Sequence, residues 1–559
     1  MSNDAGVTAA VAPQTTRGNA VTHVTRLHTV EDAQRFRTLG WWRDRCLFEL
    51  VDEWADRVAN KTAVTDGARE WTYAQLRDES LRAAQVLFDL GVRPGDAVAV
   101  QVPSSALIPV LHFAVNRLGA IFVPVPEMWR AAEVEAVVRG SRATVLLVPA
   151  GRDFDHLGMA RDLQAAVPGL TCVLPLIGDG DSFVSRTMAA RPDLDRIAEG
   201  RPSPDDVLSV ICSSGTTGTP KLSAFSSNDV LTNISQVADA MGLGHDDVMG
   251  GIAPANTGST GYLYGVLAPL VLGATAHVLE RWSPEAAAAL LSGERCTAAV
   301  AIPTQIVMLM SLNDETHDYA NLRVFLNGGA ALSASVAAAA EDRMGCAVLG
   351  IYGASESAFP TCARHDDPVD KRRSTVGRPA PGQELRLVDE NGADVTAGEP
   401  GEVRWRGPNA SFGFLNQPEL DRLAWDDEGY FRSGDLGVVD GDGYLRIVGR
   451  LKDMILRGGL NIYPAEIESL LFQIPAVQDV AVVGVPDARL GERACAVVVL
   501  RDEGAPLTVE EMSAFLGGAG LARFKHPEYV LVVATLPRAA SAKLDKSAIR
   551  RTAMQVLGV

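Results

Sequence analysis

Runs of consecutive apolar residues alternate with amphipathic segments along most of the chain. The apolar runs at residues 97–102, 143–148 and 298–302 are typical of strands that are buried on both faces. Residues 73–90 and 284–291 instead carry apolar side chains at helical spacing. This alternation predicts an α/β fold in which helices are layered on largely parallel sheets.

The pattern changes after residue 377. Short strand-like segments at residues 383–388, 401–406 and 444–448 are separated by turns rich in Gly, Pro and Asp. Turn signals at such short intervals predict a small antiparallel, β-rich subdomain.

A compact α+β pattern occupies the C-terminal end of the chain. Helices are expected at residues 464–473 and 508–516, and strands at residues 477–485, 493–500 and 529–533. About 110 residues of this kind suit a domain with a core of its own. We therefore expect an N-terminal domain at residues 26–451 and a C-terminal domain at residues 452–559, preceded by a disordered polar tail at residues 1–25.

Length, charge and cysteine content limit the class of protein. A chain of 559 residues is too long for one compact core, so at least two domains are expected. The formal net charge of −18 argues against nucleic acid or an anionic membrane surface as the main partner, because both require clustered Lys and Arg. Seven cysteines without C-x-x-C spacing indicate core thiols of a reducing compartment. With neither a secretory signal pattern nor a membrane-spanning run, we expect a cytoplasmic protein with no membrane partner.

A segment of small hydroxylated residues and glycines follows the apolar run at residues 207–212. Its residues are Ser213, Ser214, Gly215, Thr216, Thr217, Gly218, Thr219, Pro220 and Lys221. Glycines let the backbone approach an anion closely, and successive N–H groups form a concave anion site to which hydroxyls add donors. The spacing of a Walker A loop is absent, and the composition alone would also fit a flexible turn. Together with the motifs downstream, the segment predicts a loop for the phosphates of a nucleotide.

Two glycine-containing runs follow predicted strands, where the ligand sites of α/β folds gather. Gly328, Gly329 and Ala330 come after a strand expected at residues 322–326, and Tyr352 and Gly353 after one expected at residues 347–351. The backbone of the first run offers a flat wall for a purine, and the ring of Tyr352 can stack on that purine. Singly, each run also fits a tight turn.

Three further polar residues supply what a nucleotide condensation requires. Glu356 is a hard oxygen ligand suited to Mg²⁺ on phosphates. Asp435, in a Ser-Gly-Asp run expected to end a loop, can accept hydrogen bonds from both ribose hydroxyls. Lys543 lies in an Ala- and Ser-rich loop and could place its charge on a developing phosphate anion.

The order of these motifs resembles that of the ANL superfamily of adenylate-forming enzymes, which includes acyl- and aryl-CoA synthetases, peptide-synthetase adenylation domains and luciferases. The resemblance extends from Thr29 to Arg551 and is strongest at residues 449–468. Residues 36–42 further resemble the stand-alone aryl-acid AMP ligases and some cyclic-acid CoA ligases. The resemblance implies a large N-terminal domain of layered sheets and helices with a β-rich subdomain, and a small mobile α+β C-terminal domain.

The reaction that the resemblance implies has two halves. ATP, with Mg²⁺ held by Glu356, would adenylate a carboxylic acid of aromatic or cyclic type and release pyrophosphate. The catalytic residues would be Lys543, Glu356 and Thr216, with residues 214–221 holding the pyrophosphate and Arg450 joining Asp435 at the ribose.

In the second half-reaction the acyl group would pass to a thiol, from coenzyme A or from the phosphopantetheine arm of an acyl carrier protein. The C-terminal domain would rotate about Lys452 and present Arg457, Gly458 and Gly459 for thioester formation. The partners implied are therefore a small-molecule acid and an optional carrier protein, and no nucleic acid.

The substrate end departs from the family pattern. Asn256 matches the pocket asparagine of the aryl-acid ligases, but the His or aromatic residue that usually precedes it is Ala255. Residues 221–228 lack the usual basic and His positions, and Ala542 replaces the usual Gly before Lys543. The residues expected to contact the acid are Asn256, Gly329 and Ala354. These departures leave the ATP motifs intact and put the identity of the substrate in question.

Two alternatives remain open at this point. An ATP-dependent diazotase, which activates nitrite for an aryl amine, would share the nucleotide motifs and differ at the substrate end. A non-catalytic ATP- or AMP-binding protein would arise by loss of motif residues, but Lys221, Glu356, Asp435 and Lys543 are all present. Pyrophosphate release distinguishes the three, because each predicts a different requirement for acid and nitrite.

Overall fold

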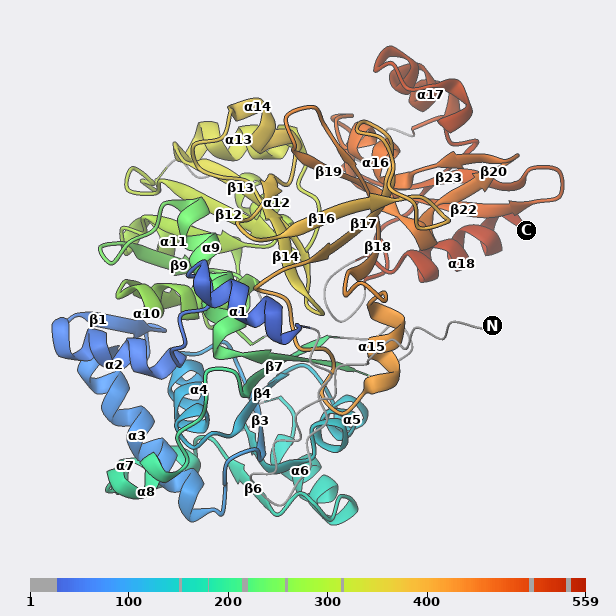
Figure 1. Ribbon diagram of the computed structural model, residues 1–559. Helices are drawn as coiled ribbons and strands as arrows, with labels where there is room; N and C mark the ends of the chain where they lie inside the picture. The colour runs from blue at the N-terminus through green and yellow to red at the C-terminus, as the bar shows by residue number, and fades with distance from the viewer. Residues whose placement is uncertain are drawn as a thin grey trace.

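The computed structural model describes residues 28–149, 153–178, 180–213, 220–256, 260–312, 316–501, 507–538 and 544–559. Within these residues the strands form four sheets, three in the N-terminal part and one at the C-terminal end (Figure 1). Ser214, Gly215, Thr216, Thr217, Gly218 and Lys543, and the expected tail at residues 1–25, lie outside the described residues.

A mostly parallel sheet carries the strand that leads into the expected phosphate loop. In the order β6-β5-β3-β4-β7-β8 its strands are Cys172–Pro175, Ala143–Val148, Ala97–Val102, Ile121–Pro126, Val207–Ser213 and Lys221–Ser226. All pairs are parallel except β7 with β8. β3 is buried along its whole length, as expected of an apolar strand covered on both faces.

A second mixed sheet has the order β15-β14-β13-β12-β11-β9-β10-β1-β2. In chain order its strands are β1 (Thr62–Thr65), β2 (Glu70–Thr72), β9 (Val248–Gly251), β10 (Thr275–Val278), β11 (Ala298–Ala301), β12 (Val324–Gly328), β13 (Ala347–Ala354), β14 (Ala358–Cys362) and β15 (Arg378–Pro379). The six central strands, β13, β12, β11, β9, β10 and β1, pair in parallel. At the edges, β2 pairs antiparallel with β1, β14 with β13, and β15 with β14. The α/β fold with largely parallel sheets is thereby confirmed.

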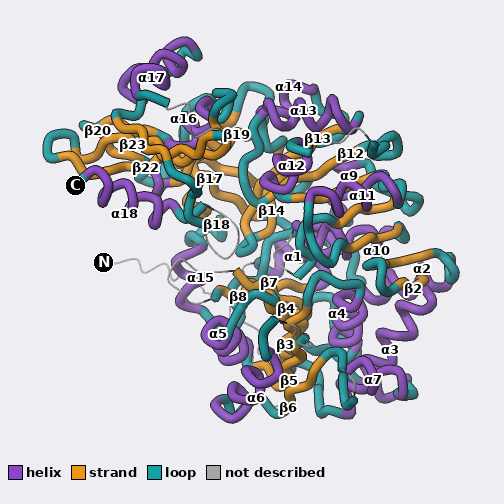
Figure 2. The backbone as a smooth tube through the Cα atoms, turned by 180° about the vertical axis from the view of Figure 1, so that it is seen from behind, coloured by secondary structure: helices purple, strands orange, loops and turns teal. Residues whose placement is uncertain are grey.

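The two remaining sheets follow the change of pattern in the sequence. An antiparallel sheet contains β16 (Glu384–Val388), β17 (Gly401–Arg406), β18 (Phe431–Val439) and β19 (Leu445–Arg450). The C-terminal sheet contains β20 (Ile455–Arg457), β21 (Leu460–Ile462), β22 (Val477–Asp487), β23 (Gly491–Leu500) and β24 (Tyr529–Val532). Both backbone views place this last sheet beside β16–β19 and away from the sheet that contains β7 (Figures 1 and 2).

Helices cover and separate the sheets. Those before β20 are α1 (Val30–Thr38), α2 (Leu47–Arg57), α3 (Tyr73–Asp89), α4 (Leu107–Arg117), α5 (Ala131–Ser141), α6 (His156–Ala166), α7 (Phe183–Ala189), α8 (Leu194–Glu199), α9 (Ser227–Met241), the π-helix η1 (Thr260–Leu267), α10 (Ala268–Leu272), α11 (Pro284–Gly293), α12 (Pro303–Met310), α13 (Ala334–Met344), α14 (Val369–Ser374) and α15 (Pro418–Ala424). The C-terminal helices are α16 (Pro464–Leu471), α17 (Val509–Gly518) and α18 (Lys546–Leu557).

The largest core connects the two mixed sheets. It runs from Val98 and Phe122 in one sheet to Met249 and Val300 in the other. Side chains of α4, α9 and η1 fill the space between them, so a site between the sheets is positioned by a continuous packed interior.

Three of the polar motifs lie within strands, although we expected them after strands or in a loop. β12 extends to Gly328, β13 includes Tyr352, and β18 contains Asp435. The glycines in these motifs suggested turns. At Gly353, however, glycine is required by space, because a Cβ atom there would lie 2.3 Å from the carbonyl oxygen of Ala358 on the neighbouring strand. Glycine therefore serves the close pairing of β13 with β14 at this point.

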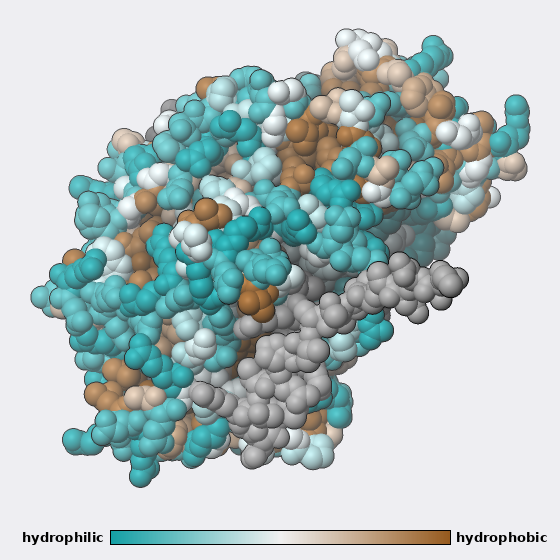
Figure 3. All heavy atoms as spheres, viewed as in Figure 1, coloured by the Kyte–Doolittle hydropathy of each residue, from teal (hydrophilic) through white to brown (hydrophobic). Residues whose placement is uncertain are grey.

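The surface and the cysteines agree with the composition. On the part of Figure 3 that is not grey, hydrophilic side chains predominate and hydrophobic ones form separate patches. No helix in the described residues is long and apolar enough to cross a membrane. All seven cysteines are free thiols, as expected.

Candidate active site

The expected phosphate loop connects two antiparallel strands that hold its ends together. β7 ends at Ser213 and β8 begins at Lys221, and these two residues face each other in the register. Both side chains reach Glu356: its Oε1 lies 3.3 Å from Lys221 Nζ and 3.4 Å from Ser213 Oγ. The structure thus brings together three predicted residues from segments more than a hundred positions apart in the chain.

Glu356 lies in the turn between β13 and β14, and its position is fixed through its backbone. Ser411 Oγ donates a hydrogen bond of 2.5 Å to the Glu356 carbonyl oxygen. The carboxylate is 19% exposed, so it remains available to a ligand. Lys221 also lies over the ring of Phe414, with 5.6 Å between Nζ and the ring centroid.

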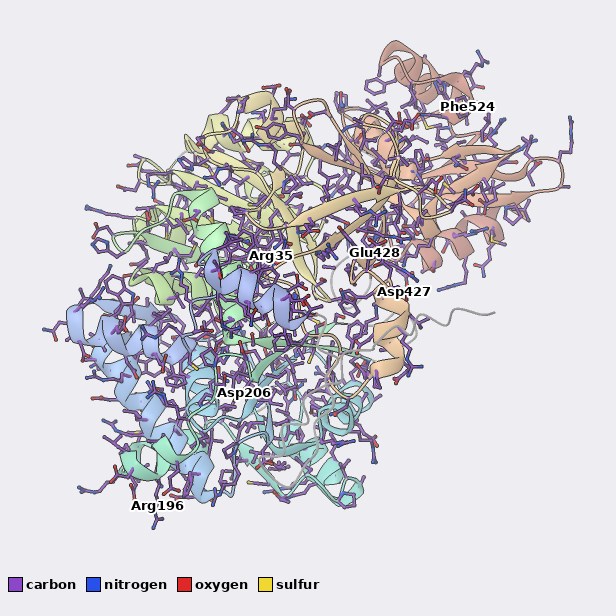
Figure 4. The ribbon with its side chains drawn as sticks, in the orientation of Figure 1. Arg35, Arg196, Asp206, Asp427, Glu428 and Phe524 are labelled. Carbon is purple, nitrogen blue, oxygen red and sulfur yellow. The ribbon has the colours of Figure 1, made fainter. Side chains whose placement is uncertain are left out.

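Helix α1 supports the segment that carries Ser411. Phe36 and Trp42 pack against Phe412, and Trp42 Nε1 donates to the Pro408 carbonyl oxygen at 2.9 Å. Arg35, labelled in Figure 4, projects from α1 and pairs with Glu384 of β16 at 3.2 Å. The aromatic run at residues 36–42 therefore has a structural role next to the site.

The predicted ribose contacts form a second cluster, with residues from β13 of one sheet and from β18 and β19 of another. Asp435 of β18 accepts a hydrogen bond from Tyr352 OH at 2.9 Å and forms an ion pair with Arg450, whose Nε lies 2.7 Å from its Oδ1. Burial, and then the charge of Asp435, raises the pKa of the Tyr352 phenol well above its ordinary value. The phenol therefore stays protonated and donates to Asp435, which orients the carboxylate for further acceptance.

The predicted purine wall lies at the end of β12. A Cβ atom at Gly328 would lie 2.7 Å from Ile351 Cγ2, and Gly329 has φ +91°, so both positions favour glycine. Gly329 and Ala330 are exposed, whereas Tyr352 contacts Trp405 edge-on with its ring. The wall is thus open to a ligand on the side away from the sheet.

On the substrate side, Asn256 lies in the segment that follows β9. Its Nδ2 donates to the Val102 carbonyl oxygen at 3.0 Å, and Ala255 N donates to Ser104 Oγ at 3.0 Å. These bonds fix the segment against the end of β3. Ala354, the other predicted substrate contact, is the last residue of β13 and is half-buried.

A cavity between the two mixed sheets adjoins Asn256 and was not foreseen in the sequence. Its polar lining residues include His112 of α4, Ser209 of β7 and Tyr262 of η1. Cys212, next to Ser213, also lines it. An isolated His on an apolar helix resembles an ordinary core residue, so the sequence carried no signal for this cluster.

The residues predicted for the second half-reaction follow Arg450 in the chain. Lys452 is exposed in the short helix η2 (Leu451–Asp453), between β19 and β20. Arg457 Nε pairs with Glu528 at 2.6 Å, Gly458 N donates to the Leu490 carbonyl oxygen, and Gly459 has φ +82°. These contacts lie within the C-terminal domain and fix the Arg-Gly-Gly loop against its own sheet.

Comparison with known proteins agrees with this architecture. The family described as AMP-binding enzyme matches residues 51–415, and the family described as AMP-binding enzyme C-terminal domain matches residues 466–543. The chain is 33% identical to the medium-chain fatty-acid–CoA ligase of Escherichia coli (strain K12), over 93% of each chain. It is 34% identical to the 2-hydroxy-7-methoxy-5-methyl-1-naphthoate–CoA ligase of Streptomyces carzinostaticus, over 93% of this chain and 95% of that one.

A solved structure is also similar. The anthranilate CoA ligase AuaEII in complex with anthranoyl-AMP superposes with a TM-score of 0.84 at 26% identity, over 92% of this chain and 98% of that chain. All three proteins are named as CoA ligases, so neither the diazotase nor the non-catalytic alternative gains support. The chain belongs to the ANL superfamily of adenylate-forming enzymes, and it is an ATP-dependent ligase that adenylates a carboxylic acid for transfer to a thiol.

Proposed function

We propose that this enzyme activates an aryl carboxylic acid with MgATP and transfers the acyl group to coenzyme A. The observation that carries the ATP chemistry is the convergence of Ser213, Lys221 and Glu356 at the base of the expected phosphate loop. An ammonium group and hydroxyl donors at this point would stabilise the leaving pyrophosphate, while positioning supplies most of the rate.

Glu356 would hold the metal of MgATP. Within the described residues no three His, Cys, Asp or Glu gather into a metal site. This fits Mg²⁺, which proteins commonly hold through one or two carboxylates together with the substrate phosphates. Bound there, Mg²⁺ would offset phosphate charge during attack by the carboxylate. Lys221, now paired with Glu356, would turn to the phosphates when the nucleotide enters.

Asp435 and Arg450 would hold the ribose, and Gly328, Gly329 and Ala330 would lie along the adenine, with Tyr352 against it. Lys543 would place its charge between the carboxylate of the acid and the α-phosphate. Thr216 and its neighbours would surround the β- and γ-phosphates.

The C-terminal domain would rotate about Lys452 between the two half-reactions. Rotation would withdraw Lys543 and bring Arg457, Gly458 and Gly459 to the adenylate, where the thiol attacks. The exposed position of Lys452 between two strands supports a hinge at this point.

The acid class is proposed from the substrate end and from the relatives. Two of the three similar proteins are named for aromatic acids, a naphthoate and anthranilate, and the third for medium-chain fatty acids. Asn256, Gly329 and Ala354 would contact the acid. Coenzyme A is the proposed acceptor because all three are named as CoA ligases.

Pyrophosphate release over a panel of aryl, cyclic and fatty acids, each with and without nitrite, tests the proposal. We expect release with ATP, Mg²⁺ and an aryl acid alone, followed by an acyl-CoA thioester when coenzyme A is added. Release with fatty acids only would contradict the acid class. Release that requires nitrite would indicate a diazotase, and absence of release with every acid would indicate a binding protein. Thioester formation only on a carrier protein would contradict the acceptor.

A further inference from the structure

The cavity beside Asn256 is lined mainly by apolar side chains and carries polar groups at one point. Phe122, Phe225, Val230 and Leu263 supply much of the apolar lining. The cavity also borders Ala255, whose small side chain leaves room there, and Cys212, which comes just before the expected phosphate loop. It therefore lies next to the place where the carboxylate of the acid would meet the nucleotide.

The polar groups of the cavity form a hydrogen-bonded relay centred on His112. Its Nδ1 lies 2.5 Å from Tyr262 OH, and its Nε2 lies 2.7 Å from Ser209 Oγ. The exposed fractions are 1% for His112 and 7% for each partner. The imidazole stacks on Phe122, with 4.6 Å between ring centroids and 13° between planes, so its orientation is fixed.

The relay is electrically neutral. Burial lowers the pKa of His112 to about 3 and raises the pKa of Tyr262 well above its ordinary value. A neutral imidazole has one N–H donor and one acceptor nitrogen, so it donates to one hydroxyl and accepts from the other. In either tautomer, the hydroxyl that accepts the hydrogen bond from the imidazole N–H still has its own O–H available to donate to another acceptor.

Among the described residues, neither Ser209 Oγ nor Tyr262 OH has a second hydrogen-bond partner. A buried hydroxyl hydrogen without an acceptor costs free energy, so the relay is complete only when an acceptor occupies the cavity. A carboxylate or ammonium would have to be desolvated beside neutral partners, so an uncharged group fits best.

The size of the cavity limits what can enter. Its volume is about 30 Å³ for the centres of water molecules. A cavity that fits a single water leaves almost no freedom to the centre of that water, so this volume accommodates a few waters or a small substituent. A hydroxyl or methoxy group is of suitable size.

We propose that this cavity recognises a hydroxyl or methoxy substituent on the ring of the aryl acid, through hydrogen bonds with Tyr262 and Ser209 that His112 orients. The inference rests on the proposed function, since it requires an aryl acid with its carboxylate at the phosphate loop. Ser209 and Tyr262 are then specificity residues, and His112 is a positioning residue.

Matched acids and two conservative variants test the inference. Benzoate is compared with its hydroxy, methoxy and fluoro derivatives at each ring position, by kcat/KM for ATP–pyrophosphate exchange. We expect the wild type to favour at least one hydroxy or methoxy acid over benzoate and its fluoro analogue by at least tenfold. Tyr262→Phe and Ser209→Ala should reduce this preference to within about threefold, mainly through KM for the substituted acid, with benzoate nearly unaffected.

Tyr73→Phe is the matched control, because it also removes a buried phenolic hydroxyl, which donates to the Ala274 carbonyl oxygen at 2.6 Å. The control should keep the wild-type preference. A second measurement avoids turnover: calorimetric binding of acyl-sulfamoyl adenosines with and without the substituent should show the same preference and the same loss.

Three results would overturn the inference. Equal changes for all acids in Tyr262→Phe and Ser209→Ala would show a structural role only. Binding of both sulfamoyl compounds without preference would leave the proposed function standing and remove the recognition site. Binding of neither would reject the aryl-acid proposal and this inference together.

Discussion

The nucleotide end and the acyl end of the site are built in opposite ways. Lys221, Glu356, Asp435 and Arg450 are charged and remain partly open to solvent. His112 and its two hydroxyl partners are neutral and buried between the sheets. The first arrangement suits a highly charged ligand that every adenylation shares, and the second suits a neutral group that distinguishes one acid from another. Variants at the first end should therefore affect all acids alike.

The largest effect is expected at Lys543. Lys543→Ala should reduce adenylation by about a thousandfold for every acid, because the charge that stabilises the developing phosphate anion is lost. ATP binding should change little, which calorimetry can show. Lys546→Ala, which removes the partner of Glu468 at 2.8 Å, is the control and should adenylate normally. Adenylation by Lys543→Ala within a few-fold of wild type would reject the assigned role.

A smaller loss is expected at Glu356. Glu356→Gln should lower kcat about a hundredfold and raise the Mg²⁺ concentration required, because a neutral amide is a poorer ligand for a hard cation. Titration of pyrophosphate release with Mg²⁺ at saturating ATP measures both. Glu399→Gln changes an exposed carboxylate elsewhere and should leave the titration unchanged. An unaltered Mg²⁺ requirement in Glu356→Gln would remove the metal role.

Arg450 comes next. Arg450→Ala should raise KM for ATP about tenfold with kcat nearly unchanged, because it removes a charge-assisted bond that orients Asp435. Arg446→Ala, at an exposed arginine four residues earlier on the same strand, is the control. A change in KM for only one acid would contradict the division between the two ends.

The smallest effect on activity is expected from the titration of His112. Because burial lowers its pKa in the folded state to about 3, the imidazole stays neutral through the working range and should add no pH dependence to acid preference. The unfolded chain binds this proton below pH about 6.5, so stability should fall as pH drops from there towards 3, by about 1.4 kcal/mol per pH unit. Urea unfolding at pH 6.5 and 5 measures the slope, and His112→Gln should lack this contribution. Equal slopes would show that His112 is protonated in the fold.

The same division decides what the sequence could reveal. Apolar runs marked β3 and β5 at their observed bounds, because a strand covered on both faces is apolar along its length. The bounds of β17 were also predicted, from alternating residues between turn signals. The nucleotide motifs could be recognised in the sequence because an anion site needs glycines and hydroxyls in one short segment. Tyr262 lies 150 positions from His112, and Ser209 lies 97 positions from it, so no local pattern could join them. Ser411, which holds the Glu356 backbone, was missed for the same reason.

The attachment of the C-terminal domain has a thermodynamic consequence. In the described part of the chain, the ion pairs of this domain, such as Arg457 with Glu528 and Lys525 with Glu466, join residues of the domain itself. Turning about the proposed hinge breaks none of these ion pairs, so they do not oppose it. A ligand that binds one orientation ten times more tightly than the other shifts the balance between the two orientations by about 1.4 kcal/mol. Nucleotide and thiol would thus favour opposite orientations of the C-terminal domain, and the bound ligand would decide which orientation is populated.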